Sequence, residues 1–198
     1  MNMRKVILGF ALSLLLGNGV VVAADVDKGL MAFQTGDFKT ALSVWVPFAE
    51  QGNAQAQSNL GFMYDKGNGV TQNHETAVKW YTLAAEQGDA AAQSNLAGLY
   101  DSGKGVMEND KTAVKWLKLA AKQGYTPAQS YLGVMYVNGE GVVTDYLRAY
   151  MWWSVGAYNG DKLSAEYQES IANKMTPAHI SKAQDMSSRC LESNYTDC

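Results

Sequence analysis

Few residues in this chain have the type and spacing that chemistry needs. Asp65 and Asp101 are 36 residues apart, at equivalent positions of a repeated pattern. Packed helices would hold them roughly 8 to 10 Å apart, close to the separation of about 6.5 to 9.5 Å between the two carboxyls of an inverting glycosidase. Both are expected at a solvated helix end, where neither burial nor a neighbouring group would raise the pKa of one carboxyl and make it a general acid. We therefore interpret the pair as structural.

Other catalytic arrangements are also missing from the sequence. His74 and His179 are the only histidines, and each is expected to be a solvated surface residue. Residues 98–105 read GLYDSGKG, without the Ser or Thr that follows the Lys of a phosphate-binding loop. No GxSxG, HExxH or SxxK motif occurs, which argues against the commonest serine hydrolases, zinc proteases and penicillin-recognising enzymes. We expect no catalytic residue, no metal site and no cofactor.

The N-terminus has the layout of a secretory signal peptide. Arg4 and Lys5 precede an apolar stretch over 6–16 and a short run that ends in small residues at Ala24. This order predicts cleavage after Ala24 and a periplasmic or secreted protein if the source is bacterial. An uncleaved membrane anchor is the alternative, although Gly17 shortens the apolar run below the roughly 20 residues of a spanning helix.

Net charge bears on the class of partner. Removing residues 1–24 takes away two basic residues and no acidic one, so the formal charge changes from −3 to −5. A mildly acidic protein has no electrostatic reason to bind nucleic acid or anionic lipid. We expect no nucleic-acid partner and no stable membrane insertion after signal cleavage.

The two cysteines, Cys190 and Cys198, lie at the extreme C-terminus. A secreted chain meets an oxidising environment, which favours a small loop closed by a disulfide. Metal binding is the weaker alternative, because structural zinc sites use four ligands and no histidine is close in sequence. Whether the bridge forms within one chain or between two stays open.

A sequence repeat of 36 residues predicts the helices that would position these side chains. Leucines, tyrosines and glycine pairs recur at that spacing: Leu60, Leu96, Leu132, Tyr64, Tyr100, Tyr136, Gly67, Gly69, Gly103, Gly105, Gly139 and Gly141. Such a period indicates stacked supersecondary units. The leucine and tyrosine four residues apart predict a first helix over 53–64, 89–100 and 126–136, with Thr126 as the N-cap of the third. A glycine-containing loop then leads to a second helix.

The ends of the array depart from this pattern. An opening helix pair is predicted over 25–52, where Pro47 should kink or end the second helix near Val46. After Gly160 the loop motif is lost, and two closing helices are expected. The predicted organisation is a signal peptide (1–24), an N-terminal capping pair (25–52), a repeat array (53–160) and C-terminal capping helices with a disulfide-closed tail (161–198).

The segments AQSNLGFMYDKGNGV and ETAVKWYTLAAEQG resemble the Sel1-like repeat, a relative of the tetratricopeptide repeat. The elements AQxxLGxxY, GxGV and AxxWxxxAAxQG recur in order, with Ala97 and Gly156 as modest departures. The resemblance implies an all-α, right-handed α-solenoid of antiparallel helix pairs. It also implies that the concave side contacts proteins or peptides.

We expect the protein to recognise its partner through positions whose residues differ from one repeat to the next. The recurring aromatic residues, such as Trp80 and Trp116, are interpreted as inter-helix core. Positions on the opposite face of the first helices follow a spacing of four and three, and we predict a protein- or peptide-binding surface there: Gln55, Asn59, Phe62, Asn95, Tyr131 and Val134. The leading hypothesis is a non-catalytic interaction scaffold. Two alternatives are a cell-envelope enzyme or binding protein acting on peptidoglycan or β-lactam-like ligands, and a plain structural role.

Overall fold

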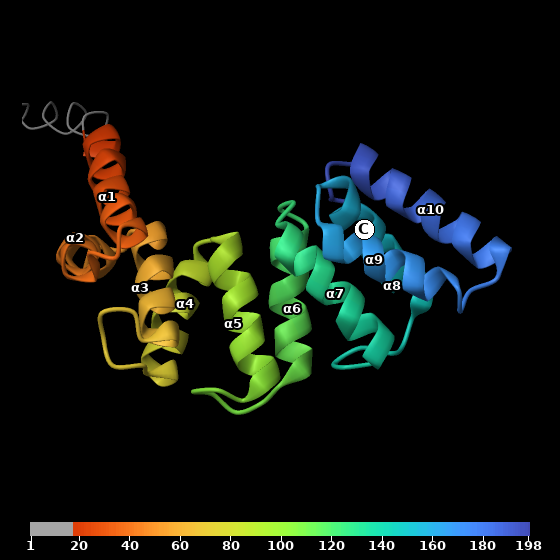
Figure 1. Cartoon of the computed structure of the whole chain (residues 1–198), viewed down its shortest axis with the longest axis horizontal. Coiled ribbons are helices and arrows are strands. Elements are labelled where there is room, and N and C mark those ends of the chain that lie inside the picture. Colours follow the sequence, from red (N-terminus) through yellow and green to blue (C-terminus); the bar gives the residue numbers. More distant parts are fainter. Residues whose placement is uncertain (1–17) are drawn as a thin grey trace, which may run out of the picture.

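The computed structural model describes residues 18–198, and the regular structure in that range is entirely helical. The helices follow one another in Figure 1 from the red N-terminal end to the blue C-terminal end: α1 (Asn18–Gln34), α2 (Phe38–Glu50), α3 (Ala54–Lys66), α4 (His74–Glu86), α5 (Ala90–Ser102), α6 (Asp110–Ala121), α7 (Thr126–Asn138), α8 (Tyr146–Tyr158), α9 (Lys162–Ala172) and α10 (Pro177–Glu192). From α1 to α9 each helix packs on the next in the chain, whereas α10 returns to pack on α8. The described residues therefore form an all-α solenoid.

The expected signal peptide falls mostly outside this range, because residues 1–17 are not among the described ones. Helix α1 begins at Asn18 and continues through Ala24 without a break. None of the described helices has both the length and the apolar character needed to cross a membrane.

Local sequence fixes the start and end of each first helix. The side chain of Asn53 accepts a hydrogen bond from the amide of Ala56, and Asp89 does the same for Ala92, so both are N-caps as predicted. The prediction was wrong by one residue for α7. Tyr125 holds its N-cap position without a side-chain hydrogen bond, and Thr126 is already helical. Pro127 still lies in the first turn, where it displaces no helical hydrogen bond.

The second glycine of each loop brings successive units into contact. Gly105 has a φ of +70°, and a Cβ there would collide with the backbone of His74 and Glu75 at the start of α4. Gly141 makes the same close approach to the start of α6, at Asp110. The recurring glycine is therefore required both by its left-handed conformation and by the backbone against which it packs.

One of the two outcomes expected at Pro47, an early end of the helix near Val46, is wrong, because α2 runs through Pro47 to Glu50. Its buried residues Trp45 and Ala49 lie on either side of the proline. Burial of both flanks holds the helix in place despite the missing amide donor.

The core contains three equivalent side chains that the repeat pattern did not single out. Tyr81, Leu117 and Trp153 are buried at equivalent positions of α4, α6 and α8, whereas Trp80 and Trp116 are only partly buried. A Cβ on Gly61 would lie 2.6 Å from the ring of Tyr81, and Gly133 faces the ring of Trp153 in the same way. In the middle unit the equivalent positions are Ala97 and Leu117, both buried in one core cluster, so the change from glycine to alanine accompanies a smaller side chain in place of the ring.

Buried glutamines link the units in a continuous ladder. Gln57, Gln93 and Gln129 are each buried and donate from Nε2 to a carbonyl eight residues earlier, at 3.0 to 3.2 Å. Their Oε1 atoms accept hydrogen bonds of 2.7 to 2.9 Å from amides 30 residues later, which belong to Gln87, Gln123 and Asn159. Each ladder glutamine thus bonds through Nε2 to the preceding unit and through Oε1 to the end of its own unit, so its buried amide group is paired on both sides.

The C-terminal tail continues this ladder. Tyr195 donates to Asn159 Oδ1 at 3.1 Å, and its ring lies against Gly124. The structure pairs Cys190 with Cys198 in a disulfide whose Cα atoms are 4.8 Å apart. The loop that this bridge closes therefore carries the side chain that caps the last rung.

Candidate protein-binding site

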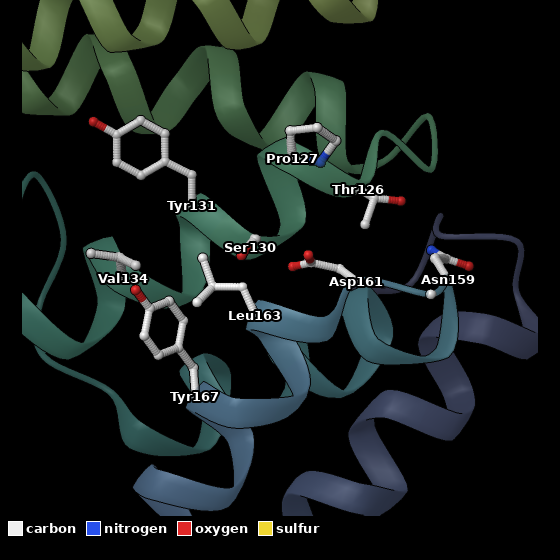
Figure 2. Close-up of a pocket in the computed structure, with 10 residues that line it drawn as sticks. Thr126, Pro127, Ser130, Tyr131, Val134, Asn159, Asp161, Leu163 and Tyr167 are labelled. Carbon is white, nitrogen blue, oxygen red and sulfur yellow. The ribbon is translucent and has the colours of Figure 1, made fainter.

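An open groove lies between the first helices α7 and α9. It has a volume of about 570 Å³, and Figure 2 shows the side chains that line it: Thr126, Pro127, Ser130, Tyr131, Val134, Asn159, Gly160, Asp161, Leu163 and Tyr167. We call this the α7/α9 groove, and we call the surface formed by α3, α5, α7 and α9 the first-helix face.

The walls of the groove are apolar and partly solvent-exposed. Leu163 and Tyr167 of α9 are 48% and 36% exposed, and across from them α7 presents Tyr131 and Val134. The Trp153 ring supports Tyr167 at a centroid distance of 5.1 Å, while its Nε1 donates to the carbonyl of Ser130. A buried indole thus braces both walls, and apolar side chains remain free to contact a ligand.

One end of the groove is anionic. Asp161 is the N-cap of α9, and its carboxylate accepts hydrogen bonds from the amide and the hydroxyl of Ser164 at 3.0 and 2.5 Å. Desolvation by burial raises the pKa of Asp161, but the Ser164 hydrogen bonds outweigh it and the net pKa lies below the usual carboxyl value. Asp161 is therefore ionised at neutral pH.

Tyr131 is fixed in place by the preceding unit. Its hydroxyl donates to Asp101 Oδ2 at 2.5 Å, which connects α7 to the end of α5. Burial and then the Asp101 hydrogen bond raise the pKa of Tyr131 well above the usual phenol value. The hydroxyl stays protonated, and the ring forms a rigid part of the groove wall.

The structure brings together only two of the side chains predicted to bind. Tyr131 and Val134 line the α7/α9 groove, whereas Gln55 and Asn95 are exposed on α3 and α5 outside it. Phe62 is half-buried, with its ring 5.8 Å from that of Phe33.

Asn59 is also half-buried on α3, and its Nδ2 is buried without a hydrogen-bond partner among the described residues. Four of the six predicted positions therefore lie outside the α7/α9 groove.

Sequence reasoning missed the half of the groove that α9 provides. Leu163 and Tyr167 follow Pro127 and Tyr131 by 36 residues, so α9 continues the register of the first helices. The loss of the glycine loop after Gly160 hid this continuation. Extending the period past the last full motif would have identified both residues.

The groups first considered for catalysis have structural partners instead. Asp65 is 9% exposed and not solvated as expected, and it contacts His74 Nδ1 at 3.1 Å and Lys66 Nζ at 2.7 Å. These contacts brace the loop between α3 and α4. Asp101 holds Tyr131, and His179 is exposed on α10. Over residues 18–198, no three acidic, histidine or cysteine side chains gather as metal ligands would.

This geometry defines a class of protein: an all-helical repeat scaffold whose copy-specific residues line a surface groove. A family model described as Sel1 repeat matches residues 54–89, 90–125 and 126–161, and the chain belongs to that family. Sel1-repeat proteins generally mediate protein–protein interaction and are typically non-enzymatic scaffolds.

Two solved structures resemble the fold. A Sel1 repeat protein from Oxalobacter formigenes shares 35% identity over 72% of this chain and 59% of its own, with a TM-score of 0.68. The protein c5321, a protective antigen of uropathogenic Escherichia coli displaying an SLR fold, shares 29% identity over 88% of this chain and 47% of its own, with a TM-score of 0.54. The chain thus covers roughly half of each. A search of curated proteins found no match.

Proposed function

We propose that this chain is a secreted or periplasmic adaptor without catalytic activity, and that it binds a protein or peptide on its first-helix face. The α7/α9 groove carries the proposal. Its apolar walls leave Leu163 and Tyr167 partly exposed beside a rigid Tyr131. Such a site suits one or two apolar side chains of a partner, which would anchor it as buried aromatic contacts do in other interfaces.

The rest of the first-helix face would provide flanking contacts. Gln55 and Asn95 are exposed on the same succession of helices, and the predicted positions Asn59 and Phe62 lie beside them on α3. We propose that a long partner contacts α3 and α5 through these polar side chains while its apolar anchor occupies the α7/α9 groove. A repeat array offers such an extended surface.

The proposed compartment rests on two features of the sequence. Residues 1–24 have the layout of a signal peptide, and a disulfide between Cys190 and Cys198 would persist in an oxidising compartment. Intact-mass measurement of protein exported by its natural host, with and without reductant, tests both points. A mature chain that begins before Asp25 would reject the signal peptide, and a mass that reductant does not change would reject the disulfide.

Matched substitutions test the groove. A photo-reactive residue at Pro127, at the groove edge, captures the partner for identification and purification. The purified partner is then titrated against Leu163→Glu and Tyr167→Ala. The controls are Leu83→Glu and Tyr146→Ala, because Leu83 is 45% exposed, Tyr146 is 36% exposed and neither lines the groove.

We expect the groove variants to weaken binding by roughly tenfold or more, the usual effect of losing an interface anchor, while the controls bind normally. Equal affinities for all four variants would reject the groove as the binding site. Turnover of labelled peptidoglycan fragments or of a β-lactam by the purified protein would reject the non-catalytic part of the proposal.

A further inference from the structure

A line of lysines runs along α6. Lys111, Lys115, Lys118 and Lys122 are spaced by four, three and four residues, which places them on one side of the helix. They line a hollow of about 470 Å³ together with the apolar residues Val114, Leu119 and Val142. We call this the α6 lysine groove; it shares no lining residue with the α7/α9 groove.

The lysine line belongs to one copy of the repeat. In α4 the equivalent positions are Glu75, Lys79, Thr82 and Glu86, and in α8 they are Leu147, Met151, Ser154 and Tyr158. The unit that contains α8 therefore folds with no lysine at these positions, and the unit that contains α4 with only Lys79. Their concentration on α6 stands out further because the whole chain carries a net charge of −3.

The folded protein gains little from this arrangement. None of the four lysines forms an ion pair with a carboxylate of residues 18–198. Like charges four residues apart disfavour a helix, and Lys111 lies in the first turn of α6, at the positive end of the helix dipole. A partner that carries negative charge would remove this repulsion.

The polar contacts that these lysines do make leave their charge uncompensated. Lys118 lies 5.7 Å from the centre of the Tyr136 ring, which Arg148 also approaches at 5.8 Å. Lys115 lies 6.0 Å from the Trp116 ring, and Lys122 donates to the carbonyl of Thr196 at 3.4 Å. Aromatic faces and a neutral carbonyl thus position three of the ammonium groups, and none of these contacts is with a carboxylate.

We propose that the α6 lysine groove binds an extended acidic segment of a partner protein. Carboxylates would pair with the lysines, and intervening apolar side chains would contact Val114, Leu119 and Val142. Eleven residues of helix rise about 16 Å, which five or six residues of extended chain also span. Alternate side chains of an extended chain are about 6.6 Å apart on one side, close to the rise of about 6 Å between lysines four residues apart.

The hollow favours a peptide over an anionic membrane surface. A layer of lipid headgroups would meet the lysine ammonium groups but leave the apolar lining of the groove without a partner. A peptide that alternates acidic and apolar residues satisfies both parts of the lining. Such a segment would also be repelled by the acidic remainder of the protein, which directs it to this groove.

The test uses the full mature protein and a labelled seven-residue peptide that alternates Asp or Glu with Val. Fluorescence anisotropy measures its affinity for the wild type, for Lys115→Gln combined with Lys118→Gln, and for Leu119→Ser. The matched control is Lys79→Gln, which removes the lysine of α4 equivalent to Lys115. Thermal unfolding of each variant verifies that it is folded.

We expect saturable binding that weakens with added salt. The double lysine variant should lose about fivefold or more in affinity, and Leu119→Ser about twofold or more, whereas Lys79→Gln should bind normally. A peptide with Gln and Asn in place of the acidic residues should not bind.

Three results would overturn the proposal: no binding of the acidic peptide, equal loss in Lys79→Gln and the double variant, or lysine-dependent binding only to vesicles that contain phosphatidylglycerol. The last result would assign the lysines to a membrane surface instead of a peptide.

Discussion

The two grooves differ in chemistry and in how each arises from the repeat. The α7/α9 groove is apolar with an anionic end, and it forms because α9 keeps the phase of the earlier first helices. The α6 lysine groove is basic, and it forms because one second helix departs from the residues of its neighbours. A regular scaffold can therefore present two unlike surfaces, provided that the residues which build the stack are kept separate from those that line the grooves.

At the α7/α9 groove one residue, Trp153, both packs in the core of the stack and supports the groove walls. We expect Trp153→Ala to lower the free energy of unfolding by about 3 to 5 kcal/mol. Its ring fills the space against Gly133, supports Tyr167 and donates to Ser130. Urea denaturation followed by circular dichroism measures the loss. Where the variant remains folded, it should still bind the acidic peptide but not the groove partner.

Tyr146→Ala serves as the control, because its partly exposed ring on α8 does not line the groove; its effect should stay within about 0.5 kcal/mol. A cost below about 1 kcal/mol for Trp153→Ala would show that the indole does not support the groove.

The glutamine ladder connects the two regions. Gln129 bonds to Ala121 at the end of α6 and to Asn159 at the rim of the α7/α9 groove. Gln129→Leu removes both hydrogen bonds, so the Ala121 carbonyl keeps only its bond from the Gly124 amide and the Asn159 amide loses its acceptor. We expect a loss of about 2 kcal/mol in the free energy of unfolding. Gln55→Leu, an exposed glutamine on α3, should change it by less than about 0.5 kcal/mol. Equal effects would mean that the ladder does not stabilise the stack.

The periodic pattern predicted the scaffold because each repeated residue answers a local need that recurs. The position of Leu96 is buried in each of the three units, and the position of Gly103 ends the first helix in each. Repetition alone therefore identifies such positions. The same reasoning singled out Tyr131 and Val134, which line the α7/α9 groove.

Packing partners were beyond the reach of that pattern. Tyr81, Leu117 and Trp153 are chemically different, so these equivalent buried positions do not look periodic in the sequence. The tail residue Tyr195 lies outside the repeat altogether, yet it completes the glutamine ladder. Only the folded arrangement shows what these residues contact.

The anionic end of the α7/α9 groove should depend on pH. Because the folded pKa of Asp161 is lowered, its contribution to stability is present above the unfolded carboxyl pKa of about 3.9 and is lost as the pH falls through the folded pKa. At pH 7 we expect Asp161→Ala to cost about 1 kcal/mol as a lost N-cap. The difference from the wild type should shrink as the pH falls below the unfolded carboxyl pKa and through the lower folded pKa, as measured by urea denaturation.

Asp185→Ala removes an exposed carboxylate that caps no helix, and it should show a smaller cost at pH 7. A constant difference between Asp161→Ala and the wild type at every pH would show that the Asp161 charge does not stabilise α9.

The substitution with the smallest expected effect on stability, Lys111→Glu, distinguishes the two grooves most clearly. It should raise the free energy of unfolding but weaken binding of the acidic peptide. Lys111→Glu places a negative charge in the first turn of α6 and four residues before Lys115, so we expect a gain of about 0.5 kcal/mol in the free energy of unfolding. The same change should weaken binding of the acidic peptide severalfold. Lys104→Glu, in the loop before α6, is the control for net charge and should leave peptide affinity close to the wild-type value. If Lys111→Glu instead destabilised the fold while peptide affinity stayed unchanged, the lysine line would be part of the scaffold and not a surface kept for a partner.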